Sequence, residues 1–176
     1  MIWIGALVLA MVLAAIVVHV GRKPAQNHVH SARDILRAFT TLEVGGREGT
    51  LLFIEQPRSG RFLQFRLDRK MDGRASISFG FPNVAWSVRW YSPLQAALKA
   101  AGLSSSESVG SDGTKFLDVN GLTVPQAMVV AQLAVSVLEL SDLSSLRFHF
   151  EGSMEPADIM VFNERLREYD LVAKYA

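Results

Sequence analysis

The stretch LLFIEQPRSGRFLQFRLDR, residues 51–69, decides the fold because it contains two predicted β-strands joined by a tight turn. Its second half alternates apolar and polar side chains, a period of two that is typical of a strand with one buried face and one face in water. The turn residues PRSG at 57–60 favour a chain reversal. The stretch therefore predicts an antiparallel hairpin that buries Leu63, Phe65 and Leu67.

The flanking segments extend this hairpin into a larger sheet. RASISFGF (74–81) repeats the alternation after a turn, so it predicts a third strand of an antiparallel meander. VAWSVRWY (84–91) also alternates and is interpreted as a fourth strand or an extended edge. SSSESVGSDGTKFLDVNG (104–121) predicts a second hairpin, and LRFHFEG (146–152) a further strand.

Helical patterns separate these strands. SARDILRAFTTLE (31–43) and SPLQAALKAAGL (92–103) each begin with a serine suited to an N-cap, and LTVPQAMVVAQLAVSVLEL (122–140) is apolar on most sides, which predicts a central buried helix. The fold class expected is α+β. One domain over residues 31–151 would contain an antiparallel sheet packed by helices, and an amphipathic C-terminal helix would extend it over residues 152–176.

The order of these elements resembles the α/β fold of type III secretion chaperones and their TY-Chap-like relatives. Residues 51–69, 92–103 and 122–140 carry the resemblance, which covers about residues 31–140. It implies a domain that binds protein segments on a sheet face or a helix face. No individual ligand-binding residue is carried over from the family.

The first twenty residues, MIWIGALVLAMVLAAIVVHV, contain no charged side chain. Nineteen residues of helix extend about 28 Å, close to the roughly 30 Å of a bilayer's hydrocarbon core. No cationic side chain precedes the apolar run and no A-x-A cleavage pattern ends it, so a permanent anchor is preferred to a cleaved signal peptide. The sequence thus predicts a transmembrane helix at 1–20, followed by a juxtamembrane linker at 21–30.

The cationic residues that follow the span predict its orientation. Arg22 and Lys23 come directly after it and none comes before, so we expect a single-pass protein of the inner (plasma) membrane, with its N-terminus outside and its C-terminal domain in the cytoplasm. Trp3 would lie at the outer interface and His19 at the inner one. A ligating role of His19 toward a pigment or haem is the less favoured alternative.

A stripe of small residues runs along the predicted span. Gly5, Ala6, Ala10 and Ala14 would let another helix approach closely. The stripe predicts other membrane-protein subunits as partners.

Charge is segregated along the chain. Lys and Arg exceed Asp and Glu by 13 to 6 over residues 1–99, whereas acidic residues exceed basic ones by 11 to 5 over residues 100–176. A basic first half beside a span favours anionic lipid headgroups, and a net charge of only +1 disfavours nucleic acid. The chain has no cysteine, which excludes disulfides and thiolate metal sites.

Motifs of known chemistry do not occur in the sequence. H-E-x-x-H and G-x-S-x-G are absent, and GSDGTK at 110–115 lacks the spacing of a phosphate loop. His28 and His30 have a spacing usable for metal on a strand but no third ligand nearby. We therefore expect no catalytic residue, no metal and no cofactor, and the chain is predicted not to be an enzyme.

The aromatic run at 84–91 is the most informative feature outside the apolar terminus. Trp86, Trp90 and Tyr91, with Arg89 beside them, are the residue types that concentrate binding energy at protein interfaces. Alternation with valine would instead direct the two tryptophans into the core. Both interpretations stay open, and the four residues are predicted to bind a partner.

The leading hypothesis is a non-enzymatic, single-pass accessory or scaffold subunit of a multisubunit bacterial membrane complex, whether respiratory, photosynthetic or secretory. It would bind partners through its span and its cytoplasmic domain. The alternative is a membrane-tethered chaperone or assembly factor that binds a client protein.

Overall fold

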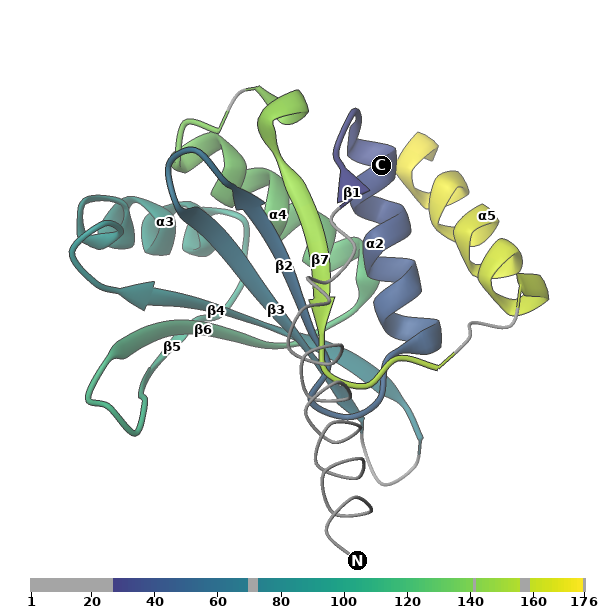
Figure 1. Ribbon diagram of the computed structural model, residues 1–176, viewed down its shortest axis with the longest axis horizontal. Coiled ribbons are helices and arrows are strands. Elements are labelled where there is room, and N and C mark those ends of the chain that lie inside the picture. Colours follow the sequence, from purple (N-terminus) through teal and green to yellow (C-terminus); the bar gives the residue numbers. More distant parts are fainter. Residues whose placement is uncertain (1–26, 70–72, 141, 156–158, 176) are drawn as a thin grey trace, which may run out of the picture.

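The computed structural model describes residues 27–69, 73–140, 142–155 and 159–175. In these parts of the chain, a seven-stranded antiparallel sheet is combined with four α-helices (Figure 1). The strands are β1 (Asn27–His28), β2 (Leu51–Gln56), β3 (Arg61–Arg69), β4 (Ala75–Asn83), β5 (Ser106–Val109), β6 (Lys115–Leu122) and β7 (Arg147–Glu151). The helices are α2 (Ala32–Gly45), α3 (Val88–Ala100), α4 (Val124–Val137) and α5 (Ile159–Tyr175), with a 3-10 turn at Leu143–Ser145.

The strands lie in the order β1-β7-β2-β3-β4-β6-β5. The hairpin predicted at residues 51–69 is β2–β3, in which Leu52 pairs with Phe65 and Ile54 with Leu63. The meander continues into β4, as its alternation predicts. The last strand of the chain, β7, inserts between β1 and β2, and β6 pairs with β4, so the sheet is completed by contacts between distant parts of the sequence.

Helices cover one face of the sheet. α2, α3 and α4 all contact it from the same side, the side toward which Leu63, Phe65 and Leu67 of β3 are buried (Figure 1). The ring of Phe65 meets Phe39 of α2 edge-on, with 4.7 Å between ring centroids. Burial of each such side chain stabilises the fold by about 1.5–3 kcal/mol. The alternation of β3 thus fixes which face receives the helices.

The C-terminal helix packs on the helical layer, outside the sheet. α5 contacts α2 and α4, and Leu166 is buried there. The hydroxyl of Tyr169 donates to the carboxylate of Glu43 on α2 at 2.9 and 3.0 Å. Burial and this hydrogen bond raise the pKa of Tyr169 well above its ordinary value. α5 is therefore held by both an apolar and a polar contact.

Capping residues set the starts of two helices. The N–H groups of His30 and Ser31 donate to the Asp34 carboxylate at the start of α2, each at 3.0 Å. These hydrogen bonds lower the pKa of Asp34. At α4 the N–H of Thr123 donates to Oε1 of Gln126 over 3.0 Å, the second half of a capping box.

The predicted membrane-spanning fold is wrong for the structure: over the described ranges, no helix is both long and apolar enough to cross a membrane. The most apolar helix, α4, has 14 residues, about 21 Å of helix against roughly 30 Å of hydrocarbon. α5 is longer but carries several charged residues. Residues 1–20, on which that prediction rested, lie outside the described residues. The predicted location in the inner membrane rested on the same span and is corrected with it.

The aromatic run at 84–91 does not form a fourth strand. β4 ends at Asn83, a turn follows, and α3 begins at Val88. Residues four apart in this run, such as Trp86 and Trp90, also face one another on a helical turn, and their ring centroids lie 6.5 Å apart. The pattern of this run fits both a strand and a helix, and in the structure Trp90 lies in the first turn of α3, where it is buried.

The apolar helix predicted at 122–140 is only partly central. Five residues of α4 are buried against its neighbours: Val124, Ala127, Val130, Ala131 and Ala134. The opposite side reaches the surface, where Val129 is 42% exposed. The helix lies in the layer that covers the sheet, and part of its surface faces solvent.

Candidate functional site

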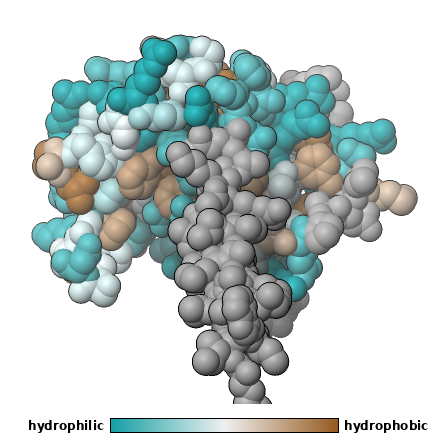
Figure 2. Space-filling view, in the orientation of Figure 1, coloured by the Kyte–Doolittle hydropathy of each residue, from teal (hydrophilic) through white to brown (hydrophobic). Residues whose placement is uncertain are grey.

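The face of the sheet opposite α2, α3 and α4 is called the open face here. No described helix packs on it, and its residues alternate with those buried under the helices. On the part of this face that Figure 2 leaves visible, apolar residues lie among hydrophilic ones. Apolar residues exposed on one face mark a candidate binding surface.

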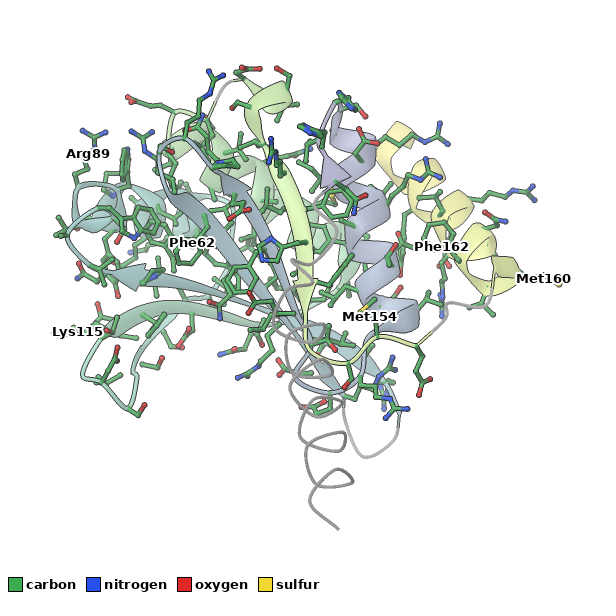
Figure 3. All side chains as sticks on the ribbon, in the orientation of Figure 1. Phe62, Arg89, Lys115, Met154, Met160 and Phe162 are labelled. Atoms are coloured by element: carbon green, nitrogen blue, oxygen red, sulfur yellow. The ribbon has the colours of Figure 1, made fainter. Side chains whose placement is uncertain are left out.

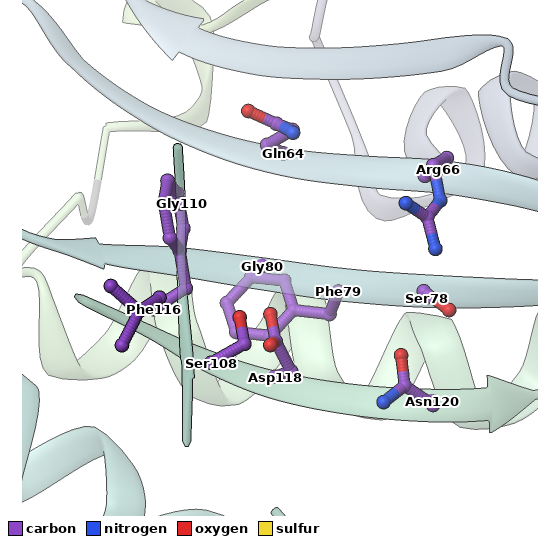
Figure 4. Close-up of a pocket in the computed structure, with 11 residues that line it drawn as sticks. Gln64, Arg66, Ser78, Phe79, Gly80, Ser108, Gly110, Phe116, Asp118 and Asn120 are labelled. Atoms are coloured by element: carbon purple, nitrogen blue, oxygen red, sulfur yellow. The ribbon is translucent and has the colours of Figure 1, made fainter. Parts of the chain in front are cut away.

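A row of cross-strand neighbours runs over the open face. Gln64 pairs with Gly80, Gly80 with Asp118, and Asp118 with Ser106, so the row crosses β3, β4, β6 and β5. Gly80 leaves a gap in the row because it has no side chain. A hollow of about 420 Å³ is centred on this gap (Figure 4).

The sheet curls around this hollow. Gln64 of β3 and Ser108 of β5 both line it, although two strands separate β3 from β5. In Figure 4, β5 crosses steeply over the other strands, and the lining side chains stand on the side of the sheet away from the helices. The curl turns a flat face into a concave one, and concave surfaces are where proteins bind ligands and peptide segments.

Several polar side chains of the hollow have no hydrogen-bond partner among the described residues. Among the described residues, the side chains of Gln64, Asp118 and Asn120 accept or donate no hydrogen bond. Arg66 is different, because its Nε donates to Oδ1 of Asp68 over 2.8 Å. The hollow thus presents two amides and a carboxylate that are available to a bound molecule.

Ser78 at the hollow is linked to Arg66 through Asp68. The hydroxyl of Ser78 donates to Oδ2 of Asp68, whose other oxygen accepts from Arg66. Ser78 and Arg66 are thus engaged within the protein.

A second cluster on the open face surrounds His149 of β7. Its ring stacks on Phe53 with 5.1 Å between centroids, and its two nitrogens lie 3.6 Å from Glu55 and 3.5 Å from Glu151. Its Nδ1 is buried and has no hydrogen-bond partner in the part of the chain that the structure describes. Throughout the described ranges, no group of three or more His, Cys, Asp or Glu residues could hold a metal ion, and this includes His28 and His30.

The predicted partner-binding residues at 86–91 separate into buried and exposed ones. Trp90 and Tyr91 are buried, at 7% and 6% exposure, and Trp86 is half-buried against Phe62 and Phe81. The guanidinium groups of Arg61 and Arg89 lie 4.5 and 3.9 Å from the centre of the Trp90 ring.

Figure 3 places Arg89 at the edge of the molecule, and its side chain is exposed. The buried aromatic residues of the run connect α3 to the end of the sheet, while Arg89 remains accessible. Whether the run binds a partner stays a prediction.

The other predicted site residues lie outside the described residues. They are Trp3, Gly5, Ala6, Ala10, Ala14, His19, Arg22 and Lys23. Their roles at a membrane interface and at a partner helix stay predictions.

Sequence reasoning did not find the hollow. Gly80 gave a signal, because a glycine within an alternating strand marks a place where a side chain is missing from one face. The partners across the row could not be identified without the pairing of β4 with β6. That pairing joins residues almost forty positions apart.

Comparison with known proteins gives no relative for this chain. No family model matches it, and neither the curated proteins nor the solved structures yield a match. The resemblance to type III secretion chaperones therefore stays a prediction.

Proposed function

We propose that the chain is a non-enzymatic accessory or scaffold protein that binds a partner protein through the open face of its sheet. The observation that carries the proposal is the concave hollow at Gly80, with Gln64, Asp118 and Asn120 around it. Unpartnered amides and a carboxylate suit the polar backbone and side chains of a protein segment.

The second candidate is a chaperone that holds a client protein transiently. The position of the hollow beside the edge strand β5 favours it, because extended segments of incompletely folded chains bind at such places. The two candidate functions differ in the lifetime of the complex. A scaffold forms a complex that survives purification, whereas a chaperone releases its client.

The test compares two arginine substitutions on opposite sides of the fold. Gly80→Arg fills the hollow, where a Cβ would meet only ordinary contacts, the nearest being Oδ1 of Asp118 at 3.5 Å. Ala96→Arg adds the same side chain to the exposed surface of α3 and serves as the matched control. Tagged full-length proteins are expressed at native level, purified under mild conditions and analysed by native mass spectrometry.

We expect the wild type and Ala96→Arg to purify with the same partner and Gly80→Arg to lose it. Circular dichroism melts confirm that both variants fold. A wild type that purifies alone after chemical cross-linking in cells would contradict the proposal, as would equal partner recovery by the two variants.

A further inference from the structure

Strand β5 forms one edge of the sheet. It pairs with β6 on one side and has no strand on the other within the described residues. All four of its residues, SESV, are exposed, and Val109 is 66% exposed. An edge of this kind presents backbone N–H and C=O groups to any extended chain that approaches it.

The register identifies which backbone groups point outward. Gly110 N–H donates to the carbonyl of Thr114 over 2.8 Å, so Gly110 faces β6. Because successive residues of a strand point their N–H and C=O groups to opposite sides, Ser106 and Ser108 also face β6. The N–H and C=O groups of Glu107 and Val109 therefore point to the free edge.

The hollow lies directly beside this edge. An added strand would place one residue opposite Ser106, in the row that continues through Asp118 to Gly80. Strands are about 4.8 Å apart, so this residue would be about 10 Å from Asp118 along the row, and less where the sheet curls. Because Ser106 is small, a long side chain can extend over it to the Asp118 carboxylate.

Charge at the site favours a basic side chain. The β5–β6 hairpin carries Glu107, Asp112 and Asp118 against a single cation, Lys115. Arg66 also lines the hollow, but its guanidinium is already paired with Asp68. The Asp118 carboxylate thus has no cationic partner in the described structure, and a Lys or Arg side chain would supply one.

We propose that β5 accepts an extended segment of a partner protein as an additional strand, with a Lys or Arg of that segment directed across Ser106 to Asp118. The proposal rests on the proposed function and deepens it, since it names the kind of segment and its mode of binding. Glu107 and Val109 bind the segment's backbone, and the hollow receives its basic side chain.

The test uses linear ten-residue peptides selected from a random phage-displayed library on the immobilised full-length protein. Val109→Pro removes the outward N–H without removing any hydrogen bond to β6, because the N–H of Val109 does not face that strand. Val109→Thr keeps both the N–H and a β-branched shape and is the matched control. Asp118→Asn removes the charge at nearly constant size.

We expect selected peptides to contain Lys or Arg among residues that favour strands. Val109→Pro should weaken their binding about tenfold, and Val109→Thr should leave it unchanged, in line with the loss of one backbone hydrogen bond. Asp118→Asn should weaken binding and reduce its dependence on salt. Methylation of every second backbone nitrogen of a peptide blocks either the N–H groups that face β5 or those that face away from it. One methylation pattern should therefore abolish binding, and the other should leave it intact.

A library that yields no binder overturns the proposal, as do binders that Val109→Pro and Val109→Thr affect equally. Pairing of β5 with β5 of a second copy would appear as a dimer that Val109→Pro dissociates, and it would also overturn the proposal. If Val109→Pro retains the native partner that Gly80→Arg loses, strand addition is wrong and the proposed function stands.

Discussion

The hydroxyl of Tyr91 donates a hydrogen bond of 3.2 Å to Oε1 of Glu107. This contact ties the buried side chain of Tyr91, in the first turn of α3, to the exposed edge strand β5, which is paired with β6. Tyr91→Phe should therefore loosen β5 and leave the rest of the sheet intact. Amide hydrogen exchange should become faster at Ser106 and Ser108, whose N–H groups face β6, and stay unchanged in β3 and β4.

The loss of global stability from Tyr91→Phe should be at most about 1 kcal/mol, since one hydrogen bond to a partly exposed partner is lost. Chemical denaturation measures it. A loss of several kcal/mol would mean that β5 contributes to the folding core and is not a loosely held edge.

Alkaline pH should weaken the same contact. Burial and the Glu107 carboxylate raise the pKa of Tyr91 from 10.0 to about 12. A raised pKa in the folded state means that the unfolded chain releases this proton first. The stabilisation is therefore complete below pH 10 and is lost as the pH rises toward 12.

The wild type should lose stability over this interval more steeply than Tyr91→Phe. Denaturation midpoints recorded across the interval check the difference. Tyr169 contributes equally to both curves and does not affect the comparison.

Acid should weaken the start of α2. Hydrogen bonds from the His30 and Ser31 backbones lower the pKa of Asp34 in the folded state below 3.8. A group whose pKa is lower in the folded state stabilises the fold at pH values above its unfolded-state pKa. This stabilisation is lost as the pH falls through its folded-state pKa.

Asp34→Ala should cost at most about 1 kcal/mol at pH 7, because the carboxylate is largely exposed to solvent. The difference from the wild type should vanish in strong acid. A constant difference at all pH values would show that the carboxylate charge is not responsible.

Substitutions of Trp90 and of Arg89 should distinguish the part of the aromatic run that stabilises the fold from the part that is exposed at the surface. Trp90→Ala should destabilise the fold by about 3–5 kcal/mol, as expected for a buried aromatic side chain. Arg89→Ala should cost about 1 kcal/mol or less, because it removes one exposed cation–π contact. Urea denaturation measures the free energy of unfolding of both variants. Equal losses of stability would contradict the assignment of Trp90 to the core.

Gly80→Val should fill the hollow without damage to the fold. The backbone at Gly80 is not in the left-handed region, and an added Cβ meets no atom closer than 3.5 Å. Because valine favours strands and glycine does not, stability should stay constant or rise by at most about 1 kcal/mol. Peptide binding should fall, and unchanged binding would place the site elsewhere.

Local patterns predicted the centre of the sheet, and long-range contacts determined the rest. The alternation of Leu63, Phe65 and Leu67 identified β3 and the face that the helices cover, because a period of two depends only on neighbouring residues. The run from Trp86 to Tyr91 satisfied both a strand and a helical turn, so its pattern could not choose between them.

The hollow depends on the pairing of β4 with β6 and on the curl by which β3 and β5 both line it, and neither has a local signal. The predicted membrane anchor was read from residues 1–20 alone, and the described fold contains no helix that could replace it.

The most direct measurement is residue-resolved amide exchange by NMR, on the full-length protein with and without a selected peptide. Strand addition predicts slower exchange at the amides of Glu107 and Val109, while those of Ser106 and Ser108, already bonded to β6, keep their rates. Unchanged exchange at Glu107 and Val109 under saturating peptide, or protection confined to the exposed side of α4, would contradict the account.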